Sequence, residues 1–152
     1  VFDSPKYKEL LSYYLLPNIL TTYGKPSSVL IGTWREDPLL KGDYTPFSLV
    51  VIYHEQGFAI EYISMAETVG DNIRGCPANS YLTVWTWDPM QSKSLQEVVS
   101  KNAGEGINRM SIEYFKPIEV AASMNLQEFF LKFTDGESDC IDTPSSMWGG
   151  GS

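Results

Sequence analysis

The sequence predicts an α+β domain with an N-terminal helical pair, a four-stranded mainly antiparallel sheet and C-terminal helices. Three observations lead to this fold class: a helical apolar period near the N-terminus, four β-rich segments in the middle, and two helix-start patterns after them. Helices and strands are grouped rather than alternating along the chain, which favours an antiparallel sheet over a parallel one.

The N-terminal segment carries apolar residues at three- and four-residue intervals, the period of an amphipathic helix: Tyr7, Leu10, Leu11, Tyr14 and Leu15. Pro17 cannot continue the backbone hydrogen bonds, so a break is expected there, followed by a second short helix that ends at Tyr23. Gly24 suits the position after a helix end, and Pro26 prevents the helix from continuing.

Four segments predict strands, at residues 28–34, 47–53, 58–64 and 81–87. Residues 54–57 form a turn between the second and third, in which Gly57 is suited to a positive φ, so these two strands should pair antiparallel. The fourth segment alternates strictly from Tyr81 to Trp87, which indicates two faces that are both partly covered.

Two capping boxes predict the C-terminal helices. Ser94 is followed three residues later by Glu97, and Asn125 by Glu128. The second of these helices has an apolar stripe: Leu126, Phe129, Phe130 and Phe133.

Length and charge limit the organisation and the partners. The 152 residues predict a single domain over 1–148, and residues 149–152 have the Gly/Ser composition of a linker, either native or added. A net charge of −8 argues against nucleic-acid binding and against docking on anionic lipids. No apolar run approaches the roughly 20 residues of a spanning helix, so a water-soluble domain is expected.

Few residues suggest chemistry. His54, the only histidine, lies in the predicted turn with no nucleophile motif around it. Cys76 and Cys140, both in loop contexts, are predicted to form a disulfide that would imply an oxidising compartment; buried free thiols are the alternative. With two cysteines and one histidine, neither a metal site nor a cofactor is expected. The acidic residues of 135–142 lack the ligand spacing of a calcium loop.

Aromatic residues give the best binding candidates. Trp34, Trp85 and Trp87 could form an aromatic platform, with Glu36 and Asp37 in a neighbouring acidic loop. The alternative is that the aromatic side chains pack under the helices.

One segment resembles a known family. Leu20-Thr-Thr-Tyr-Gly-Lys-Pro-Ser-Ser-Val29 places a short helix before Tyr-Gly-x-Pro and a strand, and Tyr53-His-Glu-Gln-Gly57 forms the hairpin that follows. This pattern, over residues 17–64, resembles the outer-membrane-assembly lipoprotein domain (SmpA/OmlA-like) and related bacterial extracytoplasmic lipoproteins. The resemblance implies a non-catalytic, protein-contacting domain tethered by a lipid on a removed N-terminal cysteine; a fourth strand and C-terminal helices depart from the pattern.

We therefore expect a non-catalytic protein-binding or assembly module rather than an enzyme. We expect it to be extracytoplasmic, either in the bacterial cell envelope or secreted. A second hypothesis is a small hydrolase with carboxylates in a cleft between the sheet and the C-terminal helices. A third is a structural subunit of an oligomer.

Overall fold

The computed structural model describes residues 5–33, 45–91, 95, 97, 115–135 and 139–148. Its helices are α1 (Pro5–Tyr13), α2 (Leu16–Tyr23), α4 (Ile118–Ala121) and α5 (Leu126–Thr134), with short 3₁₀ helices η1 (Pro77–Asn79) and η3 (Ser145–Met147). Its strands are β1 (Ser28–Thr33), β2 (Pro46–Tyr53), β3 (Phe58–Met65), β4 (Glu67–Val69), β5 (Asn72–Gly75), β6 (Tyr81–Thr86), β7 (Lys116–Pro117) and β8 (Ile141–Pro144).

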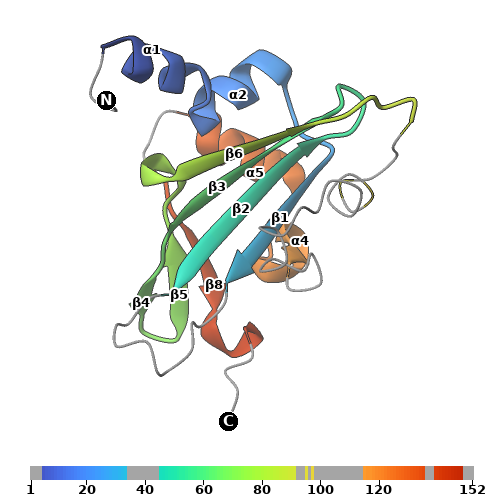
Figure 1. The fold of residues 1–152 in the computed structure, drawn as a ribbon. Coiled ribbons are helices and arrows are strands. Elements are labelled where there is room, and N and C mark those ends of the chain that lie inside the picture. Colours follow the sequence, from blue (N-terminus) through green and yellow to red (C-terminus); the bar gives the residue numbers. More distant parts are fainter. Residues whose placement is uncertain are drawn as a thin grey trace.

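Two sheets are present, as Figure 1 shows. The larger has five strands in the order β6-β3-β2-β1-β7, and the smaller has three in the order β4-β5-β8. Within the described residues, all of the strand pairings are antiparallel. The α+β class is confirmed, but the predicted sheet of four strands is wrong by one strand, because the two-residue β7 pairs with β1.

The N-terminal helices are joined to the large sheet by two tyrosine hydroxyls. Tyr53 Oη donates to the carbonyl of Gly24 at 2.7 Å, and Tyr62 Oη donates to the carbonyl of Tyr14 at 2.8 Å. Burial raises the pKa of both hydroxyls, so both remain protonated donors. Gly24 follows α2, as predicted, and has a φ of 80°, which glycine adopts more readily than other residues.

Alternate residues of the sheet face two different clusters. On one face, Phe47, Leu49 and Val51 of β2 pack in the main core with side chains of α2, α4, α5 and the small sheet. This face is filled by apolar groups, and in Figure 1 α5 lies behind the sheet. The other face, called here the second face, carries Val50 and Ile52 in a separate apolar cluster.

The predicted capping box of α5 is confirmed. Asn125 accepts from the Glu128 amide at 2.9 Å, and Glu128 accepts from the Asn125 amide at 2.8 Å. Phe129 and Phe133, four residues apart, place their rings in the main core with centroids 5.0 Å apart. For the other predicted C-terminal helix, Leu95 and Glu97 are helical, and Ser94 lies outside the described residues.

Candidate binding site

β6 forms an edge of the large sheet. It pairs with β3 from Phe58↔Thr86 to Ile63↔Tyr81, and within the described residues no strand pairs with its other side. The amide of Trp87 donates to the carbonyl of Gly57 at 2.9 Å. Because hydrogen-bonded pairs alternate along an antiparallel ladder, the backbone groups of Leu82, Val84 and Thr86 point away from β3.

The sequence of β6, YLTVWT, contains no charged residue and no proline. Folded proteins usually protect an edge strand from pairing with another chain by making it short, charged or interrupted by proline. The other three sheet edges in the described part of the chain follow this rule: β7 is Lys-Pro, β4 begins with Glu67, and β8 contains Asp142 and ends in Pro144. Among the described sheet edges, β6 is therefore the one that carries neither charge nor proline.

The side chains of β6 leave this edge open to solvent. Tyr81 is 84% exposed and Val84 43% exposed, although each belongs to a residue type that usually packs inside. Thr83 and Thr86 are exposed as well. An uncharged strand with open backbone groups and exposed apolar side chains can accept another strand.

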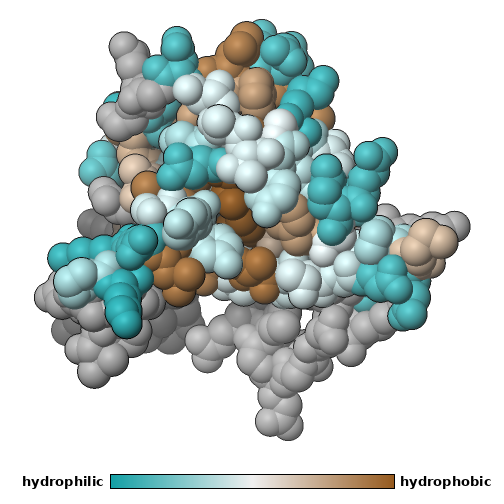
Figure 2. Space-filling view, turned by 90° about the horizontal axis from the view of Figure 1, so that it is seen from above, coloured by the Kyte–Doolittle hydropathy of each residue, from teal (hydrophilic) through white to brown (hydrophobic). Residues whose placement is uncertain are grey.

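The N-terminal helices add apolar surface on the main-core side of β6. Leu10, Tyr13 and Leu15 are exposed, while Tyr14 and Leu82 are half-buried against the main core. Figure 2, which views the molecule from the side of α1 and α2, shows hydrophobic surface in a recessed central area with more hydrophilic residues around it. Apolar surface of this kind is typical of a contact site.

Trp85 and Trp87 lie on the second face, half-buried against the cluster that contains Val50, Ile52 and Leu95. They are thus placed beside the open edge, and their role in binding stays a prediction. The other predicted binding residues, Trp34, Glu36 and Asp37, lie outside the described residues.

His54 lies in the turn between β2 and β3, as predicted. Its ring is half-buried and meets Trp87 edge to face, with centroids 6.4 Å apart. Among the described residues, His54 Nδ1 has no hydrogen-bond partner. The ring contact is with an aromatic side chain rather than a nucleophile, so the turn assignment stands.

Glu61 is a buried carboxyl that sequence reasoning did not single out. It is 2% exposed, lies on the second face opposite Val50 and Thr83, and accepts a hydrogen bond from Ser48 Oγ at 2.6 Å. Burial raises its pKa above the ordinary value, while the Ser48 bond acts in the opposite direction. The available signal was a carboxylate between Ile60 and Tyr62 in an apolar strand.

The hydrolase hypothesis expects a cleft with carboxylates between the sheet and the C-terminal helices. In the described ranges, apolar side chains fill the space between the sheet and α5, where the cleft was expected. Glu61 lies on the opposite face, and its side-chain hydrogen bond is with a serine rather than a second carboxyl group. The described residues also contain no group of three or more His, Cys, Asp or Glu side chains that could hold a metal ion.

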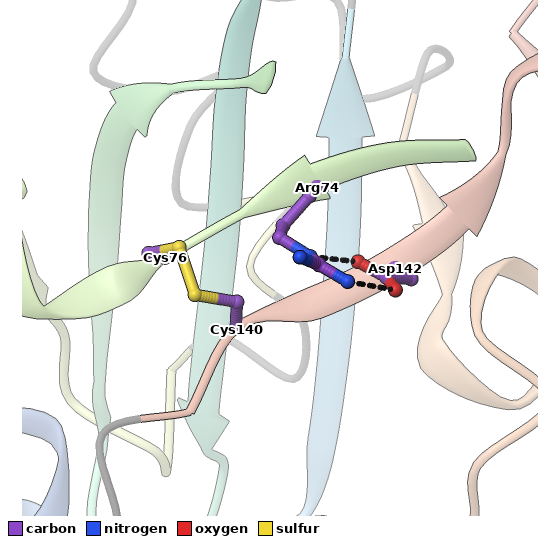
Figure 3. Close-up of a disulfide and its surroundings, with 4 residues drawn as sticks. All are labelled: Arg74, Cys76, Cys140 and Asp142. Carbon is purple, nitrogen blue, oxygen red and sulfur yellow. Dashed lines mark hydrogen bonds and ion pairs between the residues drawn. A yellow bond between two sulfur atoms is a disulfide. The ribbon is translucent and has the colours of Figure 1, made fainter. Parts of the chain in front are cut away.

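The predicted disulfide is confirmed. Cys76 and Cys140 are bonded, and Figure 3 shows the bond joining the end of β5 to the start of β8. Beside it, Arg74 donates to both carboxylate oxygens of Asp142, at 2.7 and 2.9 Å, an ion pair that lowers the pKa of Asp142. Asp142, one of the acidic residues of 135–142, is thus paired across the small sheet.

The disulfide also lies shortly before β6 in the chain. Cys76 directly precedes η1, and η1 leads through Ser80 into Tyr81. Gly75, next to Cys76, packs its backbone on the ring of Phe47, where an added Cβ would overlap the ring atoms. The segment that leads into β6 is therefore held against the main core at Gly75.

Comparison with protein-family models, with curated proteins and with solved structures finds no match to this chain. Among the described residues, no helix is both long enough and apolar enough to cross a membrane. The disulfide fits a protein that matures in an oxidising compartment.

Proposed function

We propose that this protein is a non-catalytic, extracytoplasmic protein-binding or assembly module whose contact surface is the open edge of β6. The observation that carries the proposal is the contrast between β6 and the other three described sheet edges. Those edges have charge or proline, and β6 has neither over six residues. An unprotected edge in a folded domain is the position at which another chain pairs.

The side chains around β6 support the same proposal. Tyr81 and Val84 are exposed, and Trp85 and Trp87 lie half-buried next to them. Aromatic residues contribute a large share of the binding energy in protein interfaces because they bury much area with few rotatable bonds. The edge thus combines main-chain hydrogen-bonding groups with aromatic side chains.

The extracytoplasmic location is supported by the disulfide, since such bonds persist in secreted and envelope proteins and are rare in the cytosol. The resemblance of residues 17–64 to the SmpA/OmlA-like domain suggests a bacterial lipoprotein tethered through a lipid on a removed N-terminal cysteine. Thiol alkylation with and without reduction, on protein taken directly from the producing cell, tests the compartment. Cysteines that react only after reduction agree with the proposal, and immediate reaction contradicts it.

Site-specific photo-crosslinking in the producing cell tests the binding function. A benzoylphenylalanine at position 81 preserves an aromatic group at an 84% exposed site at the beginning of β6. The control places the same group at Val120, which is 56% exposed on α4, the helix that follows the opposite edge strand β7. We expect an adduct of discrete mass with another protein from position 81 and none from position 120. Equal yields at both positions, or no adduct at either, would contradict the proposal.

A further inference from the structure

We infer that the β6 edge binds an extended segment of another protein as an additional strand of the large sheet, and that this segment has an uncharged β-rich centre and basic flanks. This inference rests on the proposed function and specifies its partner. Strand addition of this kind draws affinity from main-chain hydrogen bonds and specificity from alternate side chains.

The backbone geometry supplies the bonding groups. The inward bond from Trp87 to Gly57 sets the alternation, so Leu82, Val84 and Thr86 each present one N–H and one C=O to an incoming chain. No backbone partner of these outward groups is found among the described residues. The six residues of β6 extend over roughly 20 Å, which matches a segment of about six residues.

Side chains on the two sides of the edge specify the centre of the segment. One set of its alternate residues would lie beside Leu82 and Val84, on the main-core side of the sheet. The other set would lie beside Tyr81 and Trp85 on the second face. Cross-strand pairs of this type favour β-branched and aromatic partners, and neither set places a charge next to the segment.

Charge and area favour another protein over a second copy of this chain. The chain has 19 acidic and 11 basic residues, a net charge of −8, so two copies repel one another while a basic segment is attracted. A dimer through this edge, about 20 Å long, would also need contacts beyond the edge to reach the roughly 1,200 Å² that is typical of stable dimers. A flexible segment bound mainly through its main chain has no such requirement.

Selection from a library of random twelve-residue peptides displayed on phage, against the immobilised full chain, tests the inference. We expect enriched sequences with alternating β-branched or aromatic residues and lysine or arginine at the flanks. The affinities of synthetic versions are then measured for the wild type, for Val84→Pro and for the uncharged control Met90→Gln. Met90 is 89% exposed and lies beyond β6, so its substitution leaves the edge intact.

Val84→Pro removes an outward N–H and places a ring at the edge, yet it breaks no bond between β3 and β6, since the N–H of residue 84 points outward. We expect at least tenfold weaker peptide binding for Val84→Pro and an unchanged affinity for Met90→Gln. If Val84→Pro does not fold, Val84→Lys gives the same test, because a lysine at the edge hinders pairing. The inference would be overturned if no peptide is enriched, if the enriched peptides have acidic flanks, or if the wild type and the edge variant bind the peptides equally.

The same variants separate this inference from the proposed function. A crosslinked partner that persists in Val84→Pro means that the protein binds a partner by another mode, and the strand-addition inference fails alone. If the wild type gives no crosslinked partner, the proposed function fails too. Sedimentation velocity of the purified chain is expected to show a monomer; a dimer that Val84→Pro dissociates would assign the edge to a second copy and overturn the choice of partner.

Discussion

Replacing both Cys76 and Cys140 by alanine should lower the free energy of unfolding by about 4 kcal/mol. The bond joins residues 64 positions apart, and the chain-entropy relation for a closed loop of this length gives about 4 kcal/mol at room temperature. Domains of this size are stable by only about 5–15 kcal/mol, so the change removes a large fraction of the total. The small sheet and the chain that enters β6 should loosen first, because the bond fixes their ends.

Urea unfolding followed by tryptophan fluorescence measures this loss. Wild type under reducing conditions is the matched comparison, since it opens the same loop without a change of sequence, and it should lose a similar amount. The slope of free energy against urea should also rise, because the unfolded chain without the cross-link exposes more surface. A loss below about 1 kcal/mol in both samples would refute the view that the disulfide stabilises the fold by constraining the unfolded chain.

Three further substitutions test the packing of the sheet. Glu61→Gln should raise the free energy of unfolding at neutral pH. The pKa of Glu61 is higher in the folded state than in the unfolded chain. The wild type is therefore most stable below the unfolded pKa of about 4.3, and it loses stability as pH rises through the folded pKa. The difference in melting temperature between variant and wild type should therefore grow as pH rises from the unfolded pKa through the folded one; a constant difference would show that Glu61 does not titrate as described. Gly75→Ala should destabilise by at least about 1–3 kcal/mol in urea unfolding, because the new Cβ would overlap the Phe47 ring, and an unchanged midpoint would mean that the ring moves freely. Tyr62→Phe should cost about 1 kcal/mol by removing the hydroxyl bond that ties the N-terminal helical segment to the sheet; equal stability and equal amide protection of that segment would contradict the role given to this bond.

Local chemistry predicted much of the fold. The glycine after α2, the turn at Gly57 and the capping box at Asn125 each depend on a few neighbouring residues, and all three are found. The break predicted at Pro17 lies instead at Tyr14 and Leu15, and Pro17 is in the first turn of α2, where its missing N–H breaks no helical hydrogen bond. The four long strands were found because five or more consecutive residues carried a recognisable period. The disulfide followed from two cysteines in loop contexts.

The remaining elements depend on contacts between distant residues. β7 is Lys116–Pro117, and a two-residue strand that contains proline has no period to detect. β5 and β8 pair across a long separation in the chain, as Ile73↔Thr143 shows. Short strands of this kind form because their partners are held in place by the disulfide and the main core.

The candidate site was only partly predictable. Alternation placed Trp85 and Trp87 in the fourth predicted strand, but the sequence does not reveal that β6 ends the sheet, since strand order is a property of the whole fold. Glu61 was missed because a lone carboxylate in a strand is usually assigned to a solvent face, and its Ser48 partner lies on another strand. A charge-free edge became visible only by comparison with the other edges.

Amide hydrogen exchange of the free protein, followed residue by residue by NMR, tests the central claim most directly. If the edge of β6 is open, the outward amides of Leu82, Val84 and Thr86 should exchange at least about tenfold faster than the inward amides of Thr83 and Trp85, which bond to β3. An alternating pattern along β6 is therefore the expected result. Equal protection of all five amides would mean that the edge is already paired within the chain, and it would contradict the assignment of β6 as the surface that receives a partner.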